Sequence, residues 1–290
     1  MINLGPNRKL VWLASYPRSG NTWARIFLHN LLDLVRGEDT GGADINDIWK
    51  YSAWEATRTL YERFLDGPPS PADWLKVSRA RPIVQAEIAA RSDRPVILKT
   101  HLAVLAIQGN STINFNATAG AVYLVRNPLD VAVSLAPHLG LTIDAAIDMM
   151  ADPKAVLGVD RREERRVFEP IGTWSGNVEG WTEGDAPTRL IVRYEDLIDD
   201  PVAGFSAIVR HMKIDATEDQ VRKAVRYSEI QQLQEQERKR GFLHRSERAT
   251  DAFFRSGRKE AWREKLDSKQ VDRIVKAHRK TMERFRYLPN

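Results

Sequence analysis

The 290-residue chain contains no cysteine. This absence excludes disulfide bonds, thiolate nucleophiles and cysteine-ligated metal sites. Long apolar runs are also missing, because no stretch approaches the roughly 18 residues that span a membrane. Residues 1–9 lack the apolar centre of a signal peptide. We therefore expect a soluble, cytoplasmic protein with no membrane partner.

The excess of basic over acidic residues is small. Lys and Arg number 44 against 39 Asp and Glu, which gives a formal net charge of +5 and an isoelectric point near 9.4. Such an excess fits an anionic ligand and does not by itself indicate nucleic-acid binding. Hydrophobic residues make up 42% of the chain, enough for a sizeable core. One α/β domain spanning residues 1–290 accommodates this length.

The common ATP-binding loop, G-x-x-x-x-G-K-[ST], is absent, but residues 10–34 carry another phosphate-binding pattern. Residues 10–15 are apolar and predict a buried strand, residues 16–22 predict a tight turn, and apolar residues at helical spacing follow. Such a strand, turn and helix direct free backbone N–H groups and the positive helix end at an anion. An ordinary strand-to-helix turn with a surface arginine is the alternative.

Four residues of this turn suit an anion. Gly20 allows close backbone approach, Ser19 and Thr22 offer hydroxyl groups, and Arg18 adds a planar positive charge. Together these groups predict a phosphate-binding site.

Three further apolar segments predict strands: residues 95–98, 121–125 and 189–193. Strands alternating with helices favour an α/β domain with a central, mainly parallel sheet. Other segments predict helices, namely 45–51, 53–64, 145–150 and a C-terminal helix from Asp267 or Ser268 to Phe285. The region from 37 to 95 is rich in aromatic residues, which either pack in the core or line an apolar substrate pocket.

Polar residues follow two of these strands. Lys99 and His101 share one face of an extended chain, because alternate side chains point the same way. Arg126 ends the next strand, and Asn127 and Pro128 predict a helix that places Ser134 two turns later. The carboxyl edge of a parallel sheet is where α/β folds bind ligands. A surface lysine, a structural histidine, and an arginine paired with a nearby carboxylate are the alternatives.

Five segments, in order, resemble the motifs of PAPS-dependent sulfotransferases (PAPS is 3′-phosphoadenosine 5′-phosphosulfate): Tyr16–Trp23, Lys99–Leu102, Arg126–Ser134, Tyr194–Leu197 and Phe253–Gly257 with Trp262. The resemblance implies a P-loop-like, three-layer α/β/α fold in a single domain. It also implies an enzyme that moves a sulfuryl group from PAPS to a hydroxyl or amine of a small-molecule acceptor and releases PAP, without a metal.

The resemblance also implies roles for individual residues. His101 is the general base, and Lys99 and Arg18 contact the transferred group. Residues that bind the donor are those of the turn (Arg18, Ser19, Gly20, Asn21, Thr22 and Trp23), those around the 3′-phosphate (Arg126, Ser134, Arg255, Ser256 and Gly257), and Tyr194, which lies with Trp23 beside the adenine.

The sequence departs from the family pattern at several positions. Arg18 replaces the usual lysine, Asn21 replaces threonine, and Ser256 replaces lysine. Residues 135–138 are less aromatic than in the family, so the acceptor pocket should differ. The family's dimerisation segment is not evident after Trp262, and the oligomeric state and acceptor are left open. The alternatives are an ATP-dependent small-molecule kinase and a non-catalytic protein that binds PAP, PAPS or nucleic acid.

Overall fold

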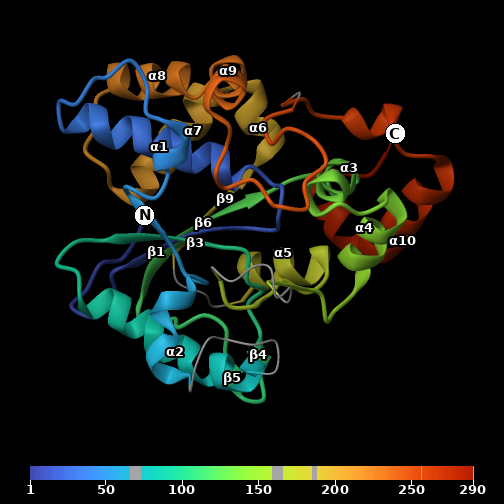
Figure 1. Ribbon diagram of the computed structural model, residues 1–290, viewed down its shortest axis with the longest axis horizontal. Coiled ribbons are helices and arrows are strands. Elements are labelled where there is room, and N and C mark those ends of the chain that lie inside the picture. The colour runs from blue at the N-terminus through green and yellow to red at the C-terminus, as the bar shows by residue number, and fades with distance from the viewer. Residues whose placement is uncertain (66–72, 159–165, 185–187, 256, 290) are drawn as a thin grey trace.

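The computed structural model describes residues 1–65, 73–158, 166–184, 188–255 and 257–289 (Figure 1). A five-stranded sheet forms its centre, in the order β2–β3–β1–β6–β9, with every neighbouring pair parallel. The strands are β1 (Leu10–Ser15), β2 (Ser52–Trp54), β3 (Val96–Thr100), β6 (Thr118–Val125) and β9 (Arg189–Arg193). The four predicted strands are therefore confirmed, and β2 adds an edge strand.

Helices cover both faces of this sheet. They are α1 (Asn21–Val35), α2 (Trp74–Ala90), α3 (Pro128–Leu139), α4 (Ile143–Ala151), α5 (Trp174–Thr182), α6 (Tyr194–Asp199), α7 (Pro201–Met212), α8 (Glu218–Tyr227), α9 (Ile230–Arg240) and α10 (Ser268–Phe285). Short 3-10 turns are η1 (Ile45–Asp47), η2 (Arg58–Leu60), η3 (Glu62–Phe64) and η5 (Ala261–Glu264). Two small hairpins pair β4 (Ala106–Ile107) with β5 (Asn110–Ser111), and β7 (Val156–Leu157) with β8 (Glu169–Pro170).

Alternation along β1 explains the three layers. Val11 and Leu13 pack with α1, α7 and α8, whereas Leu10, Trp12 and Ala14 pack with α3, α4, α5 and α10. Figure 1 shows α1, α7 and α8 on one side of the sheet and α5 on the other. A strand with both faces buried is expected in a parallel sheet, because helices cover each side.

Predicted helix boundaries are confirmed for α3 and α10, and a third predicted helix is present with wider bounds. Asn127 caps α3 by accepting a hydrogen bond from the Leu129 N–H, with Pro128 in the first helical position. Asp267 caps α10, which ends at Phe285 as expected. Helix α4 contains the predicted segment 145–150. These ends carry capping residues that the sequence displays directly.

The predicted helices over 45–51 and 53–64 are wrong. The first segment forms only the turn η1, and the second contains η2, η3 and part of β2. Ser52–Trp54 pair with β3, and strand pairing requires an extended backbone that excludes a helix there. Aromatic spacing over so short a segment does not distinguish an edge strand from a helix. Helix α2, with Pro82 inside it, received no prediction.

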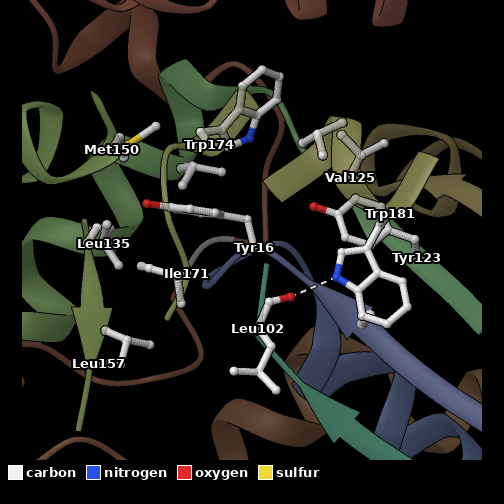
Figure 2. Close-up of a cluster of buried hydrophobic side chains, with 14 of the residues drawn as sticks. Tyr16, Leu102, Tyr123, Val125, Leu135, Met150, Leu157, Ile171, Trp174 and Trp181 are labelled. Carbon is white, nitrogen blue, oxygen red and sulfur yellow. Dashed lines mark hydrogen bonds between the residues drawn. The ribbon is translucent and has the colours of Figure 1, made fainter. Parts of the chain in front are cut away.

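A buried cluster fixes the chain just beyond β3 (Figure 2). The Trp181 indole donates a hydrogen bond to the Leu102 carbonyl at 2.7 Å, and Asn177 on the same helix donates to the His101 carbonyl at 3.0 Å. Tyr123 in turn donates to the side-chain oxygen of Asn177 at 2.8 Å. Helix α5 therefore holds the backbone on which His101 stands.

No single helix within the described ranges is long and apolar enough to cross a membrane. One bent pair, α3 and α4 at 114° to each other, passes that test by length and composition only. Both helices supply buried residues to the central core, among them Leu129, Leu135 and Ile147.

Candidate functional site

A cavity of about 1510 Å³ lies over the carboxyl edge of the sheet. Residues from the turn after β1, from the ends of β3 and β6, and from the segment after α9 line it. Predicted site residues gather there: Arg18, Gly20, Asn21, Thr22, Trp23, Lys99, His101, Arg126, Ser134, Tyr194, Arg255 and Gly257. Ser256 lies outside the described residues, and Ser19 does not line the cavity.

The turn after β1 presents backbone donors. Gly20 begins α1 with φ of 99°, and no side chain caps the helix. A Cβ on Gly20 would lie 2.8 Å from Cδ2 of Tyr194, so the ring and the turn leave no room for a side chain. Ser19 is fully buried, and among the described residues its Oγ has no hydrogen-bond partner. The uncapped N–H groups form a suitable cradle for an anion, whereas the Ser19 hydroxyl lies outside the cavity.

Asn21 and Trp23 anchor this turn. Nδ2 of Asn21 donates to the Leu13 carbonyl at 2.9 Å, which ties the start of α1 to β1. The Trp23 indole donates to the Ser228 carbonyl at 2.9 Å, and its ring meets Tyr194 edge to face with centroids 6.0 Å apart. The two aromatic rings therefore border the cavity from α1 and α6.

Arg18 joins the residues predicted around the 3′-phosphate. Its Nε donates to Ser134 Oγ at 2.9 Å and its Nη2 to the Phe253 carbonyl at 3.2 Å, while the guanidinium lies 4.3 Å from the Phe253 ring centre. Burial lowers the Arg18 pKa to about 9, and repulsion from Arg255 and Arg126 contributes. The side chain therefore lies on the α3 side of the cavity, in a place short of negative charge.

Arg126 and Arg255 complete this cationic cluster. Arg126 donates to the Arg18 carbonyl at 3.0 Å and stacks on Tyr194, with 4.3 Å from Cζ to the ring centre. Arg255 donates to the Val133 carbonyl at 3.2 Å and lies 3.8 Å from Asp251. Burial, opposed by Asp251, lowers the Arg255 pKa. An anion of several negative charges would balance the cluster of Arg18, Arg126 and Arg255.

Asp130 fastens the C-terminal segment over the site. Its carboxylate accepts hydrogen bonds from the backbone N–H groups of Glu260 at 2.8 Å and Trp262 at 3.0 Å. Arg126 reaches the same segment through the Arg258 carbonyl at 3.3 Å. Residues 253–255 and 257–262 therefore lie against α3.

The hydrogen bonds of His101 fix its tautomer. Nδ1 lies 2.8 Å from the Ser15 carbonyl, and a carbonyl oxygen only accepts, so Nδ1 carries the proton. Nε2 therefore has a lone pair, and it makes no hydrogen bond within the part of the chain that the structure describes. Burial, and then the charge of Lys99, lowers the pKa of His101 to about 3. The imidazole is neutral at the cavity.

Lys99 is buried beside an acid and an indole. Nζ lies 3.6 Å from Oε1 of Glu169 and 4.5 Å from the ring centre of Trp54. Burial lowers its pKa to about 8, with Glu169 opposing that shift and Arg166 adding to it. At neutral pH Lys99 therefore remains an ammonium in a partly desolvated place, where its charge acts strongly.

Aromatic residues from the region 37–95 divide between core and cavity. Trp49 and Trp54 line the cavity and stack at 5.8 Å with 20° between their planes, whereas Tyr61 is fully buried in the core. His138, from the segment that departs from the family, also lines the cavity. The two tryptophans form an apolar wall beside Lys99.

The family description "Sulfotransferase domain" matches residues 8–286 of this chain. The chain belongs to the sulfotransferase family. Sulfotransferase 2A2 of Mus musculus is 21% identical over 277 residues, covering 94% of this chain and 84% of that protein. Sulfotransferase 2A6 of Rattus norvegicus is 22% identical over 276 residues, with the same coverage of each chain. The resemblance inferred from the motifs is thereby confirmed, and the protein is a sulfuryl-transferring enzyme.

Solved structures share the sulfotransferase fold. Retinol dehydratase in complex with retinol and PAP matches with a TM-score of 0.63 at 19% identity, covering 97% of this chain and 83% of that chain. Mouse sulfotransferase SULT7A1 complexed with PAP matches with a TM-score of 0.57 at 18% identity, covering 97% and 86%. The predicted P-loop-like, three-layer α/β/α fold is therefore confirmed.

Sequence reasoning missed Glu169, Arg166 and the individual role of Trp54. Glu169 lies in the two-residue strand β8 and contacts the backbone N–H of His101 at 3.3 Å from 68 positions along the chain. Arg166 lies 3.6 Å from the same carboxylate and lines the sulfotransferase cavity. Neither position follows a motif, so only the folded chain brings them to the site.

Proposed function

We propose that this sulfotransferase takes a sulfuryl group from PAPS and transfers it to a hydroxyl or amine of a small-molecule acceptor, with His101 as the general base. The observation that carries the proposal is the hydrogen bond from Nδ1 of His101 to the Ser15 carbonyl. This bond leaves Nε2 unprotonated beside a cavity that Lys99 also lines. On this proposal residues 1–290 act as one catalytic domain.

The donor set of the cavity fits PAPS. The phosphosulfate end suits the uncapped N–H groups at the start of α1, where Gly20 permits close approach. The 3′-phosphate suits Arg126, Ser134 and Arg255, two guanidinium groups and a hydroxyl that line the cavity. Trp23 and Tyr194 offer rings for the adenine. We also assign Asn21, Thr22 and Gly257 to donor binding. The proposed reaction does not use a metal ion.

A neutral His101 can take a proton from the acceptor while the bond from the acceptor oxygen or nitrogen to sulfur forms. Lys99, Arg18 and the N–H groups of the turn then stabilise the charge left on PAP as the old sulfur–oxygen bond breaks. Since burial lowers the pKa of His101 to about 3, the imidazole stays unprotonated near neutral pH and can accept a proton there.

The acceptor wall supports a small molecule with an apolar body. Trp49 and Trp54 present stacked indole faces, and His138 adds a polar atom on the α3 side. Retinol dehydratase, which shares this fold, has been solved in complex with retinol and also with androsterone. Such walls favour ligands that bury apolar area and present one reactive group near His101.

The test of this mechanism is His101→Ala. With PAPS and a panel of phenols, alcohols and amines, turnover measured as PAP release should fall by about 10²- to 10⁴-fold. PAP affinity measured by calorimetry should not change, because His101 is not assigned to PAP. His278→Ala is the control, a buried imidazole that does not line the cavity and should retain most of its turnover. Near-wild-type turnover in His101→Ala would remove the base from the mechanism.

Calorimetry of the wild-type protein distinguishes the kinase and the non-catalytic alternatives. PAP and PAPS should bind equally well with and without magnesium, and ATP more weakly, since ATP lacks the 3′-phosphate. Preferential, magnesium-dependent ATP binding would identify a kinase instead. Binding of PAP without any PAP release from PAPS across the acceptor panel would favour a binding protein.

A further inference from the structure

Glu169 lies behind the cavity and contacts three groups of the site through one oxygen. Its Oε1 is 3.6 Å from Nζ of Lys99, 3.3 Å from the Trp54 indole N–H and 3.3 Å from the His101 backbone N–H. The residue is 0% exposed and does not line the cavity. Glu169 therefore does not touch a reactant directly, and it can affect the reaction only through the residues that it contacts.

The second oxygen of Glu169 faces Arg166. Nη1 of Arg166 lies 3.6 Å from Oε2, and Oε2 accepts no hydrogen bond from the described part of the chain. Burial alone would raise the Glu169 pKa, but the charges of Lys99 and Arg166 and the hydrogen bond from the Trp54 indole help to lower it to about 2. Glu169 is consequently a carboxylate at every pH near neutrality.

Lys99 needs such a carboxylate to stay charged. Burial favours its neutral amine, and Arg166 and Arg25 repel its ammonium. His101, two residues along the chain from Lys99, is neutral and supplies no negative charge that would stabilise the Lys99 ammonium. Among the main charged neighbours of Lys99 in the described part of the chain, Glu169 favours the ammonium, whereas Arg166 and Arg25 oppose it. A neutral Lys99 would have no charge with which to stabilise the transferred group.

We propose that Glu169 is a positioning residue of the sulfuryl-transfer site, which keeps Lys99 an ammonium and holds it beside the His101 backbone and the Trp54 indole. The inference rests on the roles proposed for Lys99 and His101. Because a single oxygen contacts Trp54, Lys99 and the His101 backbone, the acceptor wall and the catalytic groups are held in one arrangement. A lysine side chain has several free rotations, so its placement depends on such contacts.

The test is Glu169→Gln, which keeps the size and the acceptor oxygen and removes the charge. Lysine labelled with ¹³C at Cε reports the Lys99 titration by NMR, assigned with Lys99→Arg. The Lys99 pKa should fall from about 8 by about one unit or more, because an opposite charge at this distance shifts a pKa by that amount. The alkaline limb of kcat should move to lower pH by the same amount.

Glu55→Gln is the matched control. Glu55 is also 0% exposed, but its carboxylate pairs with Arg81 at 3.2 Å instead of with Lys99. This variant should lose stability and leave the Lys99 pKa unchanged. Glu169→Asp keeps the charge but moves it away by one methylene group, so it should lower the Lys99 pKa by less than Glu169→Gln does.

An unchanged Lys99 pKa in Glu169→Gln would overturn the proposal. If that variant does not fold, Glu169→Asp decides, because moving the carboxylate back by one methylene group should still lower the Lys99 pKa measurably. The NMR titration needs no sulfuryl transfer. Failure of the proposed function would appear as absent PAP release in the wild-type protein, independently of the Lys99 shift.

Discussion

Gly20 begins α1 with φ of 99°, and any Cβ there would meet the Tyr194 ring at 2.8 Å. Gly20→Ala should therefore weaken PAP binding by about tenfold or more, since the left-handed backbone costs about 1–2 kcal/mol for other residues and Tyr194 must move as well. Calorimetry measures the loss. Gly37→Ala is the control, because Gly37 has φ of 79° with nothing within 4 Å of its Cβ position. Equal PAP affinity in both variants would contradict the close fit between Gly20 and Tyr194.

At the same scale, the sequence could reveal only those site residues that stand in motifs. The turn residues, Lys99 and His101 follow apolar strands, so their place at the sheet edge could be inferred before the fold was known. Glu169 follows no such signal, because a two-residue strand has no period and its partner His101 lies 68 positions away. Its role depends on a tertiary contact, which a local pattern does not encode.

At the scale of elements, α3 connects the sheet to the segment that covers the site. Asp130 in the first turn of α3 is 2% exposed and accepts hydrogen bonds from the backbone of Glu260 and Trp262. Asp130→Asn should lower PAP affinity by about tenfold or more, because hydrogen bonds to a charged group contribute about 1.5–3 kcal/mol each. Proteolysis of residues 253–262 should also become faster, with and without PAP.

Asp144→Asn is the control for that experiment. Asp144 lies in the first turn of α4 and forms an exposed ion pair with Arg273. Exposed pairs contribute about 0–1 kcal/mol, so PAP affinity and proteolysis should stay at wild-type levels. If Asp130→Asn behaves like this control, the segment is held by its other contacts.

Elements that contain apolar runs or begin at capping residues could be predicted from the sequence, but the edge strand β2 could not. Strands β1, β3, β6 and β9 contain apolar runs, and α3 and α10 begin at visible capping residues. Strand β2 has three residues and was predicted as helix, because only its pairing with β3 defines it. The error matters for function, since β2 brings Trp54 to the cavity beside Lys99.

At the scale of the whole molecule, the site joins distant parts of the chain. Arg18 contacts Phe253 across 235 positions, and His101 contacts Glu169 across 68. The donor site therefore exists only when the complete fold has formed. Loss of the fold and loss of activity should therefore occur together, and lowering the pH should cause both.

Three histidines are held neutral in the folded protein: His278 is buried in the core, and His101 and His138 are half-buried at the cavity. Burial is the main cause that lowers the pKa from 6.5 to about 3 for His101, about 2 for His138 and about 4 for His278. The unfolded chain binds more protons than the folded one between these values and 6.5, so stability rises with pH across that range and is lost as pH falls. Glu169, with a pKa lowered from 4.5 to about 2, adds a further loss below its unfolded value.

The melting temperature should consequently fall as pH decreases from about 6.5 to about 4, and activity should disappear through unfolding before the free enzyme's His101 is protonated. Circular dichroism melts and PAP release, measured in the same buffers at constant ionic strength, should decline together. His278→Gln should flatten the dependence, because it removes one buried titrating group far from the donor residues. A melting temperature that stays constant over this range, or activity lost while the fold is intact, would show that the acid limb reports a titration within the site.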